Sequence, residues 1–189
     1  MLKKDDARVA KTKVKLLTNF KIMLAENTFE NITVNELCTI SGIRRATFYK
    51  HFYDKYDFLR FFVGTLRDEF DREWESKKQS VTSSYYVQYI QHFIDFLVEN
   101  ERIVANTLKS ELLHTLVYII KQQNFEDTCE KLRESVNNGM RLSASVEVVA
   151  AMMIGATASA ILHWYDTGRK TPKEQLISEI TAVIRTMYN

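Results

Sequence analysis

The chain has 189 residues, of which 46% are hydrophobic and 12% aromatic, enough apolar material for one or two packed domains. It has one proline and five glycines, which favours long helices and argues against a fold of short strands and turns. The net charge of +2 is unevenly spread, because residues 1–55 hold eleven Lys and Arg against six Asp and Glu. This basic end either meets a polyanion or forms a solvated charged face, and charge alone leaves both open.

The sequence contains little that is typical of an enzyme. Cys38 and Cys129 stand alone, without a CxxC pattern, as expected of small apolar residues in a reducing cytoplasm. The four histidines lack metal-ligand spacing, and no GxSxG or phosphate-binding glycine loop is present. We therefore expect no enzyme, no catalytic residues, no metal site and no cofactor. Residues far apart in sequence can still meet in a fold, so the enzyme hypothesis is weak but open.

Start and stop signals divide the chain into helices. A capping-box pattern, a short polar residue followed three positions later by an acidic one, predicts helix starts at Thr33, Asp54 and Thr171. Gly42 and Gly168 are stop signals. Between the signals apolar residues recur at helical spacing. The periodic stretches include residues 17–24, 59–74, 86–97, 112–120 and 176–187. The sequence thus predicts an all-α protein of about nine helices.

Residues 33–52, TVNELCTISGIRRATFYKHF, predict two short helices joined by a tight turn. The first covers residues 34–40, and the second about residues 44–51. Gly42 lies between them and can adopt the left-handed conformation at little cost. This spacing is typical of a helix-turn-helix, whose second helix enters the major groove of DNA.

The two predicted helices have distinct buried and exposed faces. We expect Leu37 and Ile40 to point inward from the first helix, and Phe48 and Phe52 from the second. The exposed face of the second helix would present Arg44, Arg45, Thr47, Tyr49 and Lys50. Arginine can donate two parallel hydrogen bonds to guanine, while hydroxyl and ammonium groups suit phosphate oxygens. Lys55, near the start of the next helix, is expected to add a phosphate contact.

The stretch from about residue 10 to residue 60 resembles the TetR family of transcriptional regulators. The matching residues are Phe29, Thr33-Val34, Leu37, Gly42-Ile43, Thr47-Phe48-Tyr49-Lys50-His51-Phe52 and Asp54-Lys55-Tyr56-Asp57-Phe58-Leu59. The resemblance implies an N-terminal three-helix helix-turn-helix domain over residues 1–60. It also implies a helical dimerisation and ligand-sensing domain over residues 61–189, similar to the Gram-positive type.

The resemblance also implies roles for individual residues. Those implied to reach bases or adjacent phosphates are Arg44, Arg45, Thr47 and Tyr49, and those implied to hold the DNA backbone are Thr33, Lys50, His51 and Lys55. Tyr49 could instead be mainly a packing aromatic, and His51 a residue at the edge of the core. Arg44 replaces the usual Ser or Thr helix cap, at a cost of about 1 kcal/mol, and is interpreted as a specificity residue or as neutral drift.

The function implied by the resemblance is that of a homodimeric, cytoplasmic bacterial regulator that binds double-stranded DNA. We expect a repressor that a small-molecule effector releases from a palindromic operator. The alternative is a TetR-fold adaptor that contacts another protein and no longer binds DNA. Residues 44–55 keep four basic residues against one acidic residue, which favours the regulator.

The C-terminal half carries predictions of a more general kind. The last two helices, about residues 145–166 and 172–187, are expected to form the dimer interface. Its expected residues are Gly155, Ala156, Ser159, Ile177, Ile180 and Ile184. Aromatic side chains are expected to line a ligand pocket, although plain core is the more frequent role of such residues. The expected pocket residues are Tyr89, Phe93, His114, Tyr118 and Trp164.

One stretch raises the question of a membrane. Residues 148–165 are uncharged, and their length of 18 is the lower limit for a membrane span. Five alanines, Gly155, Thr157, Ser159 and His163 dilute its apolar character. We therefore expect a buried helix of a soluble core here, and no membrane association.

Overall fold

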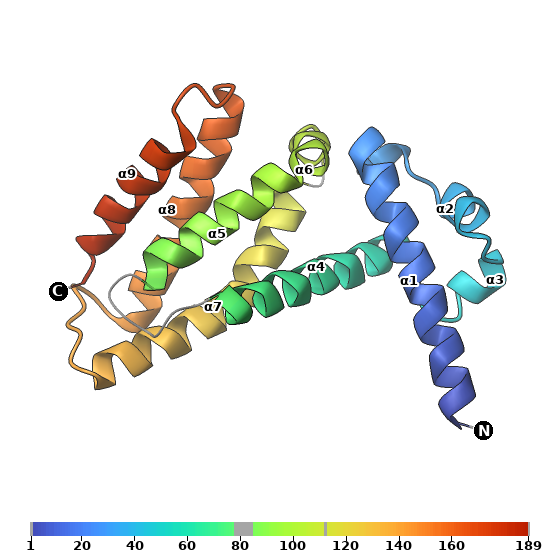
Figure 1. The fold of residues 1–189 in the computed structure, drawn as a ribbon, viewed down its shortest axis with the longest axis horizontal. Helices are drawn as coiled ribbons and strands as arrows, with labels where there is room; N and C mark the ends of the chain where they lie inside the picture. Colours follow the sequence, from blue (N-terminus) through green and yellow to red (C-terminus); the bar gives the residue numbers. More distant parts are fainter. Residues whose placement is uncertain (1, 78–84, 112, 189) are drawn as a thin grey trace. The chain divides into compact units, whose positions relative to one another are not determined.

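The computed structural model describes residues 2–77, 85–111 and 113–188 (Figure 1). Within these ranges the protein has nine α-helices, one short 3-10 helix and no β-strand, which confirms the all-α prediction. The elements are α1 (Leu2–Glu26), η1 (Phe29–Asn31), α2 (Val34–Ser41), α3 (Arg45–Phe48), α4 (Lys55–Lys77), α5 (Tyr85–Glu99), α6 (Glu101–Leu108), α7 (Leu113–Asn137), α8 (Val146–Asp166) and α9 (Lys173–Arg185).

The chain forms two compact units. The N-terminal unit consists of Met1–Glu69 and Glu99–His114, and the C-terminal unit consists of Phe70–Val98 and Thr115–Asn189. Helix α4 therefore contributes to both units. Helix α6 belongs to the N-terminal unit, although its neighbours in sequence, α5 and α7, lie mostly in the other. The division into a DNA-binding domain up to residue 60 and a dimerisation and ligand-sensing domain after it stays a prediction.

An aromatic cluster forms the core of the N-terminal unit. Phe20 of α1, 1% exposed, meets three other phenylalanine rings edge-on, at centroid distances of 6.3, 5.1 and 5.0 Å. These rings belong to Phe29, Phe58 and Phe62, so η1 and α4 both pack on α1. Helix α6 packs on α1 as well, and the Asn106 side-chain amide donates a hydrogen bond of 2.9 Å to the Leu24 carbonyl. The buried rings thus pack helices against one another that are distant in sequence.

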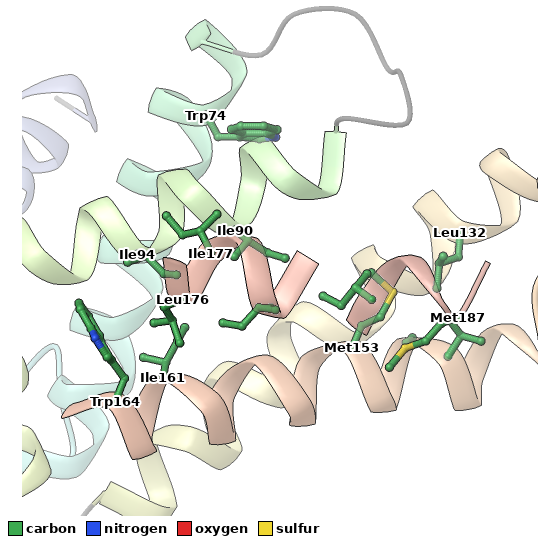
Figure 2. Close-up of a cluster of buried hydrophobic side chains, with 14 of the residues drawn as sticks. Trp74, Ile90, Ile94, Leu132, Met153, Ile161, Trp164, Leu176, Ile177 and Met187 are labelled. Carbon is green, nitrogen blue, oxygen red and sulfur yellow. The ribbon is translucent and has the colours of Figure 1, made fainter. Parts of the chain in front are cut away.

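The core of the C-terminal unit is mostly aliphatic (Figure 2). It combines residues of α4, α5, α7, α8 and α9, including Trp74, Ile90, Ile94, Leu132, Met153, Ile161, Trp164 and Leu176. Ile177, Ile180 and Ile184 also lie here, between 2% and 8% exposed. They were expected at the dimer interface, but the apolar side of α9 packs inside the protomer, against α8 among others. These three side chains are thus mostly covered within the protomer, and their assignment to a dimer interface stays a prediction.

Helices α8 and α9 are joined by a tight turn. Gly168 adopts a left-handed φ of 72°, as its position after α8 predicts. Helix α9 begins at Lys173, and Pro172 is its N-cap. Thr171 is not the cap that the sequence predicts, and its carbonyl accepts a 2.7 Å hydrogen bond from Trp164 Nε1. The helix start is therefore shifted by one residue towards the C-terminus.

Helix α8 is, by length and composition alone, able to span a membrane. Five of its side chains are buried in the core of the C-terminal unit: Val149, Ala150, Met153, Ile161 and Trp164. Core helices of soluble proteins commonly share this composition. These buried side chains place one side of α8 in the core of the C-terminal unit.

Candidate nucleic-acid interface

The start of α2 has the predicted capping box. Thr33 Oγ1 accepts a hydrogen bond from the Glu36 amide at 3.2 Å, and Glu36 Oε2 accepts one from the Thr33 amide at 3.1 Å. The Thr33 hydroxyl and amide thereby lower the pKa of Glu36. Gly42 ends the helix with a left-handed φ of 64°, and its amide donates to the Thr39 carbonyl at 3.1 Å. Both ends of α2 are fixed by local contacts that the sequence predicts.

The second helix of the motif is shorter than predicted. Regular α-helix covers only Arg45–Phe48, and hydrogen-bonded turns continue the chain to Phe52, whose amide donates to the Phe48 carbonyl at 3.0 Å. Phe48 is fully buried, with its ring centroid 5.4 Å from that of Phe52 and 5.7 Å from that of Phe58. The aromatic core thus holds one side of this segment in place.

The opposite side of the segment from Arg44 to Phe52, which we call the reading segment, is open. Its exposed residues are Arg44, Arg45, Ala46, Tyr49 and Lys50. Arg44 is the N-cap of α3 and makes no side-chain capping bond, as expected from the missing Ser or Thr. The Arg45 guanidinium lies 5.9 Å from the centroid of the Tyr49 ring, which is 48% exposed. Two arginines and a lysine therefore reach solvent from a backbone anchored by Phe48.

Two predicted DNA contacts are less accessible. Thr47 and His51 are both half-buried. The His51 ring lies 6.4 Å from the Phe52 ring, at the edge of the aromatic cluster. Both of the roles considered for His51, at the core edge and on DNA, remain compatible with this position.

One residue of α2 points away from the core. Ile40 was expected to face inward but is 58% exposed. The buried face of α2 consists of Leu37, Cys38 and Ser41, and Ile40 lies to one side of it.

Burial raises the pKa of the Cys38 thiol, and the charge of Arg45 only partly opposes this. Cys38 thus behaves as the small apolar residue that its sequence context indicates.

Lys55 lies where the sequence predicts, but its ammonium group has protein partners. It donates hydrogen bonds to the carbonyls of Phe29, Glu30 and Ile32, at 3.3, 3.2 and 3.1 Å. In the structure the Lys55 ammonium group is therefore bound to protein carbonyls and is not positioned for the expected phosphate contact.

Sequence reasoning overlooked an exposed aromatic residue beside the reading segment. Tyr53, between α3 and α4, is 86% exposed. Its backbone amide donates a 2.9 Å hydrogen bond to Asp57 Oδ2, which fixes the backbone that carries the ring. The available signal in the sequence was an aromatic residue in a polar turn, directly after the core residue Phe52.

The five expected pocket residues do not all belong to one compact unit. Tyr89 and Phe93 both contact Phe70 edge-on, at centroid distances of 5.4 and 5.9 Å. Tyr118 is 62% exposed, and His114 is exposed and belongs to the N-terminal unit. Trp164 belongs to the core cluster of the C-terminal unit, and Tyr89 and Phe93 pack against that cluster. Three of the five residues therefore share one cluster, and their role as a ligand pocket stays a prediction.

The small residues of α8 fit the predicted interface better. Ala156 and Ser159 are exposed. Met152, one turn before Ala156, is 53% exposed, and Val148, two turns before it, is 48% exposed. A Cβ atom added to Gly155 would have no heavy atom within 4 Å apart from its own helix backbone and chain neighbours. This side of α8, from Val148 to Ser159, combines apolar surface with free space.

Solved structures are similar to the chain over nearly its whole length. A protein from Syntrophomonas wolfei described as a TetR-family transcriptional regulator has a TM-score of 0.75 and 14% identity, with 94% of each chain covered. A TetR transcriptional regulator from Streptococcus agalactiae has a TM-score of 0.69 and 20% identity, covering 97% of this chain and 99% of that one. The fatty acid degradation regulator FadR from Bacillus halodurans has a TM-score of 0.68 and 14% identity, with 94% of each covered. No family model and no curated protein matches the chain.

The class of protein follows from the fold and the site together. It is an all-α protein of two compact units, in which a helix-turn-helix exposes a cationic segment. More specifically, the chain has the fold of the TetR-family transcriptional regulators. Identities of 14–20% establish the fold alone, and the Gram-positive type of the C-terminal half stays a prediction.

Proposed function

We propose that the protein is a sequence-specific DNA-binding transcriptional regulator of the bacterial cytoplasm. The observation that carries the proposal is the reading segment, where Arg44, Arg45 and Lys50 are exposed while Phe48 is fully buried. A short helical segment that is anchored by a buried ring and presents exposed guanidinium groups suits the major groove, because base edges there offer paired acceptors. Similarity to solved transcriptional regulators supports this choice.

Within this proposal the exposed residues divide by the groups that they present. Arg44 and Arg45 are assigned to base edges, since a guanidinium can donate two parallel bonds to guanine. The Lys50 ammonium group and the Tyr49 hydroxyl are assigned to phosphates of the DNA backbone, those of Tyr49 being next to the contacted bases. Tyr53 joins this set, because its exposed ring and hydroxyl follow directly on the reading segment. Thr33 keeps its hydroxyl in the capping box, so any phosphate contact from it has to be made alongside that bond.

We also propose a homodimer on a two-fold operator. A single helix-turn-helix makes few base contacts, and two-fold DNA sites match two-fold proteins. The side of α8 from Val148 to Ser159 is the proposed contact. Its support is the exposed apolar surface at Val148 and Met152, together with the free space at Gly155.

The proposed regulation is repression that a small molecule relieves, and α6 provides a route for it. Helix α6 is joined through the backbone to α5 and α7, which belong mostly to the C-terminal unit. Within the N-terminal unit, the Asn106 amide donates to the Leu24 carbonyl at 2.9 Å, and the Ser110 hydroxyl donates to Glu30 Oε1 at 2.6 Å. A ligand that shifts α5 or α7 would therefore pull on the turn that precedes α2.

The test begins with selection of bound fragments from random duplex DNA by the purified protein. We expect a two-fold motif whose half-site spacing follows the helical repeat. Arg45→Ala should then weaken binding to the selected site by about 1–3 kcal/mol and relax the preference at one position in each half-site. Arg141→Ala removes an exposed arginine of the C-terminal unit and is the matched control.

Two results would overturn the proposal. The first is a wild-type protein that retains no duplex at low salt. The second is an Arg45→Ala variant with unchanged affinity and base preference, which would remove Arg45 from recognition. A protein that binds no DNA but is captured by another protein through the same segment would be the adaptor.

A further inference from the structure

Lys55 is the first residue of α4, where its charge is unfavourable. The N-terminus of a helix carries a partial positive charge, which disfavours an ammonium group there. This terminus is also well capped without lysine, because Asp54 Oδ1 accepts from the amides of Tyr56 and Asp57 at 2.8 and 2.7 Å. The local structure of α4 therefore gives no reason for a lysine at this position.

The Lys55 ammonium is instead bound to the turn that precedes α2. Its three carbonyl acceptors, on Phe29, Glu30 and Ile32, lie on η1 and on its C-cap residue. The Phe29 carbonyl also accepts a 3.1 Å hydrogen bond from the Ile32 amide. An ammonium group has three N–H donors, so three acceptors satisfy it completely. It also lies 4.5 Å from the centroid of the buried Phe29 ring, a favourable cation–π distance.

The Lys55 hydrogen bonds join the start of α4 to the turn before α2, and this connection helps to orient the helix-turn-helix. Ile32 directly precedes Thr33, the N-cap of α2, so Lys55 ties the start of α4 to the start of α2. On the other side, Phe48 and Phe52 pack against Phe58 of the same α4. The pair of helices that carries the reading segment is thus attached to α4 at both ends.

We infer that Lys55 is a positioning residue that clamps the turn before α2 onto α4, and that it does not neutralise a DNA phosphate. To reach a phosphate, the ammonium group would have to leave three carbonyls and the Phe29 ring. Its effect on DNA binding is therefore indirect and acts through the orientation of the reading segment. Only the DNA-binding half of this inference rests on the proposed function.

The first experiment compares stability in Lys55→Met, which keeps the chain length and removes the donors, with Lys50→Met, which removes an exposed lysine. Lys55→Met should lower the melting temperature by about 5 °C, and Lys50→Met should leave it nearly unchanged. In wild type, the Lys55 ammonium protons should appear in lysine-selective NMR spectra as slowly exchanging. An unchanged melting temperature, or rapid exchange of these protons, would contradict the clamp even if the protein binds no DNA.

The second experiment measures the salt dependence of duplex binding. Each phosphate contact contributes about −0.9 to the slope of log K against log salt concentration. Lys50→Met should make the slope shallower by about this amount, whereas Lys55→Met should weaken binding with the slope unchanged. Lys55→Arg keeps the charge but cannot place three donors around one nitrogen, so it should not rescue affinity. A shallower slope in Lys55→Met, with rescue by arginine, would establish a phosphate contact instead.

Discussion

The two compact units leave different chemistry on their surfaces. The N-terminal unit buries its phenylalanines around Phe20 and exposes Arg44, Arg45 and Lys50 on the reading segment. The C-terminal unit buries the apolar side of α9 but leaves Val148 and Met152 of α8 exposed, beside small residues. A cationic surface is suited to a polyanion, and an apolar surface with free space is suited to another helix. The proposed DNA recognition therefore falls in one unit and the proposed self-association in the other.

The two units also differ in how local their determinants are. Caps, turns and an aromatic cluster build the reading segment, and most of the residues involved lie within a short stretch of sequence. The C-terminal core joins side chains of α4, α5, α7, α8 and α9, so the surface of this unit depends on which side of each helix packs inward. Predictions that separate the units test this division.

The largest effect is expected from Phe48→Ala. Removing a fully buried phenylalanine ring should destabilise the N-terminal unit by about 3–5 kcal/mol and abolish duplex binding. Both tryptophans of the chain, Trp74 and Trp164, lie in the C-terminal unit, so their fluorescence reports on that unit alone. Circular dichroism should detect early loss of helix in denaturant, while the fluorescence midpoint shifts little. Ile22→Ala, at an exposed position of α1 in the same unit, is the control. A fluorescence midpoint that falls as far as the dichroism midpoint would refute independent stability of the two units.

Gly155→Leu should act on association rather than on folding. A leucine on a closely packed helix contact costs about 1–3 kcal/mol, which weakens dimerisation by roughly ten- to a hundredfold. The protomer should remain folded, because the space next to Gly155 is open. Sedimentation at a series of protein concentrations measures this. Gly64→Leu, at a helical glycine with equally open surroundings, is the matched control. An unchanged dimer would move the interface away from α8.

The smallest effect is expected at Glu36, through pH. Hydrogen bonds from Thr33 lower the pKa of Glu36 in the folded protein below its ordinary value of 4.5. The ionised carboxylate therefore stabilises the fold above that value, and this contribution is lost as the pH falls through the lowered pKa. Glu36→Gln keeps a capping acceptor but does not titrate. Denaturant midpoints measured from about pH 6 to about pH 3 should fall more steeply for wild type, and parallel curves would show that the shift has no effect on stability.

The sequence predicted those parts of the site that depend on near neighbours. The capping box at Thr33 and the left-handed Gly42 follow from contacts within a few residues, and the inward side of Phe48 follows from its helical spacing with Phe52, so composition and spacing were sufficient. Ile40 shows the limit of this reasoning. A short amphipathic helix has apolar residues on adjacent sides, and only packing against α1 selects Leu37 and Cys38 for the core.

The sequence by itself determined an all-α chain with a helix-turn-helix near its N-terminus, because helical periodicity, caps and turns are local properties. Only the tertiary structure decided what each apolar or charged side chain meets. It turned Ile177, Ile180 and Ile184 into the protomer core, attached α6 to the N-terminal unit and bound Lys55 to carbonyls 23 to 26 residues earlier in the chain. Periodicity shows that one face of a helix is buried, and composition shows that a charge is present. Which residues contact that face or that charge is set by parts of the chain that are distant in sequence.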